Sequence, residues 1–173
     1  MEERKVTKTA TLIISAIIII LQLFYSPNWE YVGIYTDCKL IGRFLYPFFH
    51  ANLIHCCLNI WCLLSIIFIY DVSFFRLIVA YIIAITFPIN IFGQFLDNMN
   101  IPTVGLSAVV FFLFGSISFE VSRKWYYQSW MVFYIILGFV FPKTNGWLHL
   151  YAYVLGLFFA LLNKPIKPFN YDK

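Results

Sequence analysis

The sequence predicts an all-α integral membrane protein, built as a bundle of six membrane-spanning helices. The composition and the length of the chain lead to this fold class. Of its 173 residues, 62% are hydrophobic and only 12% are charged, and the mean hydropathy is +0.81. So few charges cannot cover a soluble domain, and a lipid bilayer must therefore be part of the solvent. A spanning helix needs about 20 residues, which leaves room for about six spans and their connections.

Six apolar segments follow one another along the chain, separated by polar or charged breaks. The first resembles a secretory signal, but no small-residue cleavage site follows it, so we expect it to remain as a helix. The breaks are residues 26–43, 71–73, 93–103, 121–124 and 142–146. The predicted spans are 9–25, 44–70, 74–92, 104–120, 125–141 and 147–163. No linker or internal repeat interrupts them, and we expect a single domain over residues 1–173.

Basic residues predict the orientation of the chain. With six spans, both termini and the second and fourth connections lie on one side of the membrane, and the positive-inside rule makes that side cytoplasmic if it is the more basic. The net charge of +4 is explained by such residues and requires no nucleic-acid partner. The terminal side would hold Arg4, Lys5, Lys8, Arg76, Arg123, Lys124, Lys164, Lys167 and Lys173, and the other side Lys39, Arg43 and Lys143.

Polar residues that can carry chemistry lie at one predicted depth. His50 and His55 are early in the second span, Ser107 begins the fourth, and His149 begins the sixth. These three spans run from the outer face inward, which places all four residues in the outer half of the membrane. Polar groups at this depth cost several kcal/mol unless they find partners or water. We therefore expect a wet cavity open to the outer face, with Asn52, Thr103 and Asn145 on its rim.

The second span contains two hydrogen-bond donors at helical spacing. His55 and Asn59 are four residues apart, so on a helix they share a face about 6 Å apart along the axis. Donors in this arrangement suit the oxyanion that develops during acyl transfer. A polar contact between two helices is the alternative explanation.

The fourth span begins with Gly105-Leu-Ser107, which places a serine at the outer end of a helix. Free backbone N–H groups and the positive end of the helix dipole lie there, and both favour a negative charge. Taken alone, a serine in a spanning helix more often bonds to its own backbone.

The sixth span carries His149 on the same face as Ala152, Gly156 and Ala160. Small residues at this spacing allow two helix backbones to approach closely. Close approach would bring the imidazole within reach of a hydroxyl on another helix.

Three motifs now stand in order: H-x-x-x-x-H-x-x-x-N in one span, G-x-S at the start of a later one, and a histidine before a ladder of small residues. Together they resemble the rhomboid family of intramembrane serine proteases in its minimal six-helix form. The resemblance covers the chain from about Arg43 to Ala160.

The resemblance implies a role for each matching residue. Ser107 would be the nucleophile and His149 the general base, while His55 and Asn59 would hold the oxyanion. The implied substrates are single-span or polytopic membrane proteins, cleaved near the outer face without a cofactor or a metal. The supporting residues would be His50, Phe111 packed on the catalytic imidazole, Gly105 before the serine, and Arg43 at the end of the first external connection.

Three features depart from the family pattern, and one is that no Trp directly precedes Arg43. Ala108 stands where the family usually has a second glycine, and we expect this small residue still to permit a tight helix contact. The first external connection, residues 26–43, is short, which affects the outer rim and substrate choice more than the chemistry.

Two other functions remain open. One is a catalytically inactive rhomboid-like protein that binds membrane segments, although such members lose the serine or the histidine and this chain has both. The other is a metal or proton carrier that uses His50, His55, Cys56 and Cys57. On a continuous helix, positions 50 and 55 point about 140° apart, which disfavours a shared metal.

Overall fold

The computed structural model describes residues 2–141 and 144–163 as helices joined by short connections. Apart from an isolated bridge between Ile34 and Thr103, these residues form no β-structure. The helices are α1 Glu2–Phe24, α2 Trp29–Val32, α3 Leu40–Leu45, α4 Leu53–Ile69, α5 Phe74–Ile85, α6 Ile89–Gly93, α7 Ser107–Ser116, α8 Lys124–Val140 and α9 Gly146–Leu162, with 3-10 turns at Tyr46–Phe48 and Asp97–Asn100.

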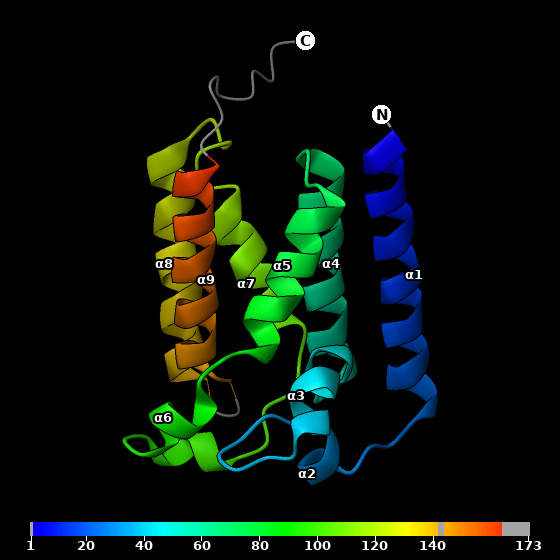
Figure 1. Cartoon of the computed structure of the whole chain (residues 1–173), viewed down its shortest axis with the longest axis vertical. Coiled ribbons are helices and arrows are strands. Elements are labelled where there is room, and N and C mark those ends of the chain that lie inside the picture. Colours follow the sequence, from blue (N-terminus) through cyan, green and yellow to red (C-terminus); the bar gives the residue numbers. More distant parts are fainter. Residues whose placement is uncertain (1, 142–143, 164–173) are drawn as a thin grey trace.

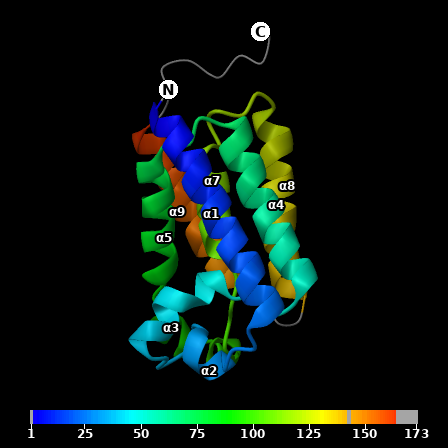
Figure 2. The same cartoon turned by 90° about the vertical axis from the view of Figure 1, so that its right-hand side faces the viewer.

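The short helix α7 lies at the centre of the bundle. It packs most extensively on α9 and also contacts α5 and α4, while α1 packs on α4 and α5. Helix α8 lies at the edge, with α9 as its main neighbour. The small helices α2, α3 and α6 lie at one end of the bundle (Figure 1), and α2 and α3 lie near the C-terminal end of α1 (Figures 1 and 2).

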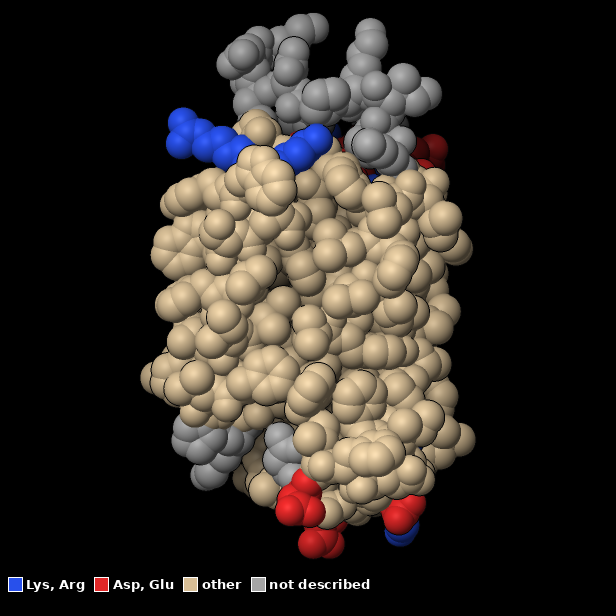
Figure 3. Space-filling model, turned by 90° about the vertical axis from the view of Figure 1, so that its left-hand side faces the viewer, with Lys and Arg blue, Asp and Glu red and all other residues tan. Residues whose placement is uncertain are grey.

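One face of the bundle carries a broad uncharged band. On the face shown in Figure 3, charged side chains lie at the two ends and the broad zone between them has none. Large apolar side chains are exposed across the long helices, among them Ile13, Trp61, Phe133 and Phe158. An apolar surface of this extent would be a severe liability in water and suits contact with lipid chains. The chain is an integral membrane protein.

Two stretches of the described chain are long and apolar enough to cross a bilayer unaided, Glu2–Phe24 and Phe74–Gly93, where the second combines α5 and α6. A third is obtained if Leu40–Phe48 and Leu53–Ile69 count as one span bent by 80°. Helices α7 and α9 are apolar but shorter. Each predicted segment contains a helix, but the count of six spans stays a prediction.

Two predicted spans differ from the structure. Residues 44–70 are not one helix, because the chain leaves helical geometry before Asn52, whose side chain caps α4 by accepting the His55 N–H at 2.8 Å. In the segment 104–120 only Ser107–Ser116 is helical. Ten residues rise about 15 Å, half the thickness of the hydrocarbon layer. The non-helical approach to α7 is tolerated because protein surrounds it: Gly105 and Leu106 are buried.

The start of α1 and the end of α9 lie at the same end of the bundle (Figure 1). That both termini face one side of the membrane stays a prediction, as does which side that is. Four of the lysines counted for it, Lys143, Lys164, Lys167 and Lys173, lie outside the described residues.

Candidate active site

Ser107 is the first residue of α7, and a shaped loop leads into it. Gly105 has φ +136°, a backbone conformation that residues with a side chain rarely adopt. A Cβ at this position would also lie 2.7 Å from Cε1 of His55. The Gly105 N–H donates to the carbonyl of Tyr46 at 2.9 Å, and the Leu106 N–H donates to Nε2 of His50 at 3.2 Å. The backbone just ahead of Ser107 is therefore held by two hydrogen bonds that it donates to the chain before α4.

The start of α7 is suited to a negative charge. The first N–H groups of a helix have no partner within it, and the helix dipole is positive at this end. Ser107 is 9% exposed and Ala108 is fully buried, so bulk water competes little for these groups. An oxyanion beside Ser107 would lie in an environment of low dielectric, where hydrogen bonds to a charge are strong.

His149 lies in the first turn of α9 with its imidazole directed at Ser107. Asn145 caps this helix, because its side chain accepts the Leu148 N–H at 3.1 Å. Nε2 of His149 lies 2.9 Å from Oγ of Ser107, which is hydrogen-bonding distance. The Phe111 ring stacks on the imidazole with 4.3 Å between centroids and 11° between planes. The structure thus brings together the three residues expected to form the nucleophile, the base and its aromatic support.

The approach of α7 to α9 depends on small residues in both helices. A Cβ on Gly156 would lie 3.0 Å from the Gly115 Cα and 3.0 Å from the Phe112 carbonyl carbon. Ala152 and Ala160, on the same face of α9, are buried. The ladder of small residues therefore faces α7, and backbone-to-backbone contact brings His149 within reach of Ser107.

His55 and Asn59 lie on one face of α4, as expected, but their surroundings differ. The half-buried His55 ring lies against Gly105, beside the loop that leads to Ser107. Asn59 is buried, and its Nδ2 donates to the carbonyl of His55 at 2.9 Å, one turn back in the same helix. One of its two N–H donors is therefore occupied by its own helix.

His50 corrects one sequence-based argument. It precedes α4, so the helical-wheel angle between positions 50 and 55 does not apply, and the two rings lie 5.1 Å apart in an edge-to-face arrangement. His50 is 2% exposed and accepts the Leu106 N–H through Nε2. It therefore supports both His55 and the backbone before Ser107. Within the described part of the chain, no group of three His, Cys, Asp or Glu residues could hold a metal ion.

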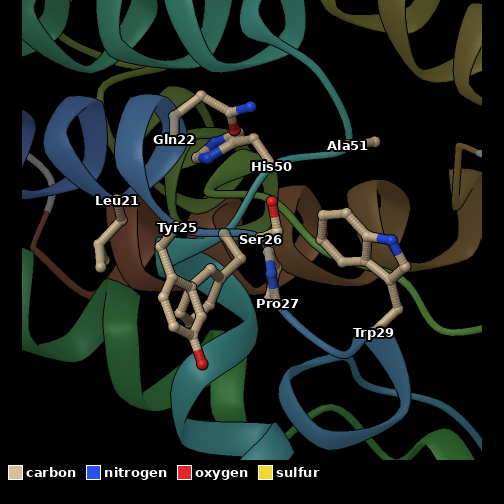
Figure 4. Close-up of a pocket in the computed structure, with 9 residues that line it drawn as sticks. Leu21, Gln22, Tyr25, Ser26, Pro27, Trp29, His50 and Ala51 are labelled. Atoms are coloured by element: carbon tan, nitrogen blue, oxygen red, sulfur yellow. The ribbon is translucent and has the colours of Figure 1, made fainter.

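A cavity of about 290 Å³ lies between the end of α1 and the chain before α4, and His50 is one of the residues that line it. Gln22, Tyr25 and Trp29 line it together with His50 and Ala51, and Figure 4 shows their side chains around it. Ser107 and His149 are not among its lining residues. This cavity is therefore separate from the serine–histidine contact.

Asn145 was expected on the rim of a wet cavity, but its side chain is buried. It is 4% exposed, and its Nδ2 donates to Sδ of Met99 at 3.4 Å and to Oγ1 of Thr103 at 3.5 Å. Its side chain thus closes the contact between α9 and the loop before α7. Asn52 is exposed and Thr103 is partly exposed, so these two remain on the rim.

Arg43 fixes the connection formed by residues 26–43. It lies in α3, and its Nη1 donates to the carbonyl of Phe87 at 2.9 Å, in the break between α5 and α6. Its Nη2 lies 3.5 Å from Oδ1 of Asn90, which also accepts the Asp37 N–H. The connection is therefore fastened to the chain that follows the C-terminal end of α5.

Gly138 of α8 is a site residue that sequence reasoning missed. A Cβ built on it would lie 2.7 Å from Nδ1 of His149, so α8 touches the imidazole through this glycine. A signal was present, because glycine inside an apolar helical segment costs about 1 kcal/mol relative to alanine and often indicates close packing. The sequence did not show what the glycine packs against.

The fold and the site define a helical membrane protein that holds a serine hydroxyl against an imidazole inside its bundle. A family model described as the Rhomboid domain matches residues 37–165, which is most of the chain, and the protein belongs to the rhomboid family. Members of this family are usually intramembrane serine proteases that act on membrane proteins in the bilayer, and inactive members exist. A comparison with curated proteins finds no match.

Proposed function

We propose that this protein is an intramembrane serine endopeptidase that cleaves membrane-spanning segments near the outer face, with Ser107 as nucleophile and His149 as general base. The observation that carries the proposal is the 2.9 Å contact between His149 Nε2 and Ser107 Oγ. A nucleophile within hydrogen-bonding reach of a base, with a third group orienting the base, is the arrangement that activates a serine. Here the orienting group is the stacked ring of Phe111.

In the first half of the reaction, Ser107 Oγ attacks the substrate carbonyl carbon while its proton passes to His149 Nε2. A C–O bond forms, and the carbonyl electrons move onto the oxygen, which becomes an oxyanion. When the intermediate collapses, the C–N bond breaks and the amine takes the proton from Nε2. An acyl-enzyme ester on Ser107 and a free amino terminus result.

In the second half, water replaces the amine. His149 Nε2 takes one proton from the water as its oxygen attacks the ester carbonyl, and the proton is returned to Ser107 Oγ when the C–O bond to the enzyme breaks. The products are a carboxylic acid and the regenerated hydroxyl. No cofactor or metal takes part in this scheme.

The oxyanion would be held at the start of α7. The backbone N–H of Ser107 lies at the positive end of the helix, and the His55 side chain lies beside the loop that carries the serine. Asn59 has one N–H left for this task, because the other binds the His55 carbonyl.

Substrates must partly unwind before they are cut. An intact spanning helix engages its amides in internal hydrogen bonds, so a few residues have to become extended before Ser107 can attack. Glycine, at about 1 kcal/mol per helix position, or proline, at about 3, makes this unwinding easier. We therefore expect cleavage near the outer end of a segment, beside small or helix-destabilising residues.

The test is to reconstitute the purified protein with a model single-span substrate, beside Ser107→Ala and His149→Ala controls. We expect the wild type to cleave the substrate and both variants to be inactive but folded, because the two residues act as a unit. Cleavage by Ser107→Ala at the wild-type rate would refute the proposal. Binding of the substrate without cleavage by the wild type would favour the inactive rhomboid-like alternative.

A further inference from the structure

We propose that Gly138 of α8 is a positioning residue for His149, and this inference rests on the proposed function of the serine–histidine pair. A Cβ on Gly138 would lie 2.7 Å from Nδ1 of the imidazole and 3.5 Å from Cε1. Helix α8 therefore forms one wall of the pocket that holds the catalytic ring.

The imidazole is held on three sides. Phe111 covers one ring face, Ser107 meets Nε2, and Gly138 meets the Nδ1 edge. Nδ1 is buried and has no hydrogen-bond partner among the described residues. Its position therefore depends on packing against α8, because no hydrogen bond to Nδ1 orients the ring.

The contact itself is anchored. The carbonyl of Gly138 accepts a hydrogen bond from Oγ1 of Thr144 at 2.7 Å, and Thr144 lies just before the Asn145 cap of α9. The end of α8 is thus fastened to the start of the helix that carries His149. The Phe141 carbonyl lies at the same 2.7 Å from this hydroxyl, so both acceptors at the end of α8 share its one proton.

A methyl group at Gly138 would displace the imidazole more readily than the backbone. Its nearest neighbour would be Nδ1 of His149 at 2.7 Å, in a side chain that can rotate. The Gly146 Cα follows at 3.2 Å and Cε1 of His149 at 3.5 Å. Gly156 differs, because the nearest neighbours of a Cβ there would all be backbone atoms of α7. Alanine is also a better helix former than glycine, so Gly138→Ala should fold.

The displacement should be costly for catalysis. Rotation of the ring away from α8 breaks its alignment with Phe111 and with Ser107 Oγ. A misplacement of about 1 Å in a catalytic group lowers the rate by about 100-fold. We therefore expect Gly138→Ala to lower kcat about 100-fold, with little change in KM or in melting temperature.

Ile135→Ala is the matched control. Ile135 lies one turn earlier on α8, is buried, and belongs to a cluster with Met131 and Tyr153 against which Phe111 also packs. Its truncation should lower the melting temperature while kcat stays within a few-fold of wild type. If Gly138 merely attached α8 to α9, Gly138→Ala and Ile135→Ala would change the melting temperature and kcat in the same way.

The direct test is the ¹⁵N NMR signal of the His149 side chain, combined with kcat for both variants. The chain has three histidines, so His149 can be assigned by its loss in His149→Gln. A changed Nε2 resonance and a lowered kcat in Gly138→Ala alone support the inference. An unchanged resonance, a wild-type kcat, or a protein that fails to fold overturns it. If the wild type cleaves no substrate, the proposed function fails, and the resonance still decides whether Gly138 holds the ring.

Discussion

His55 and Asn59 share a face of α4, but their side chains contact different groups. We therefore expect their substitutions to lower kcat by different amounts. His55 lies against the loop before Ser107, whereas Asn59 donates to the His55 carbonyl within its own helix. His55→Ala should remove an oxyanion donor and cost about 2.7–4 kcal/mol, or 10²–10³ in kcat. Asn59→Ala should cost about 1 kcal/mol, roughly fivefold. Steady-state kinetics of the two variants check the order, and a larger loss in Asn59→Ala would contradict it.

Phe111 should matter for the rate and less for the fold. Its stacked contact with His149 is worth about 0.5–1.5 kcal/mol, so Phe111→Leu should lower kcat by up to about tenfold. Phe112→Leu is the control on the same helix, because the Phe112 ring faces Phe159 and not the imidazole. We expect it to lower the melting temperature and leave kcat near wild type. Equal losses of kcat in both variants would show that the stack has no special role.

The sequence placed Ser107 and His149 at the starts of two predicted spans, and the structure brings their side chains within 2.9 Å. Spacing in the sequence was not enough for residues whose position depends on a break in helical geometry. His50 was assigned an angle on a helix that begins only at Leu53, and its bond to the Leu106 N–H follows from the non-helical chain around it. Gly138 was missed because its neighbour lies on another helix.

At the scale of helices, the contact between α7 and α9 sets the geometry of the site. Gly156→Leu should destabilise the protein by at least about 3 kcal/mol, because the new side chain would meet the α7 backbone, which cannot move aside. Val154→Leu, two residues earlier on the exposed side of α9, should be nearly neutral. Thermal unfolding in detergent measures both. Equal melting temperatures would contradict the close-packed account of α7 and α9.

The helices themselves were predictable to different degrees. The apolar segments of the sequence located α1, α4, α5, α8 and α9, because each segment is apolar and long enough to form a helix. Helix α7 was predicted too long, since hydropathy does not distinguish a helix from an apolar chain buried in protein. Gly105 at positive φ and the hydrogen bond to Tyr46 hold residues 104–106 outside the helix.

For the whole molecule, the open question is which end faces outward. Cys38 lies in the connection between α2 and α3, at the end of the bundle where α7 and α9 begin, and is partly exposed. It should react with a membrane-impermeant thiol reagent added from outside. Cys56, Cys57 and Cys62 lie within α4 and should react slowly. A Cys38→Ser variant is the control. Labelling of Cys38 only after the membrane is opened would reverse the orientation and place the site on the inner face.

The most direct test of the central claim is intact-protein mass spectrometry after treatment with a fluorophosphonate, a reagent that phosphonylates activated serines. If His149 activates Ser107, the wild type should gain one phosphonyl group, peptide mapping should locate it on Ser107, and His149→Ala should remain unlabelled. No adduct on the folded wild type, or an adduct on Ser107 that forms equally fast without His149, would contradict the account.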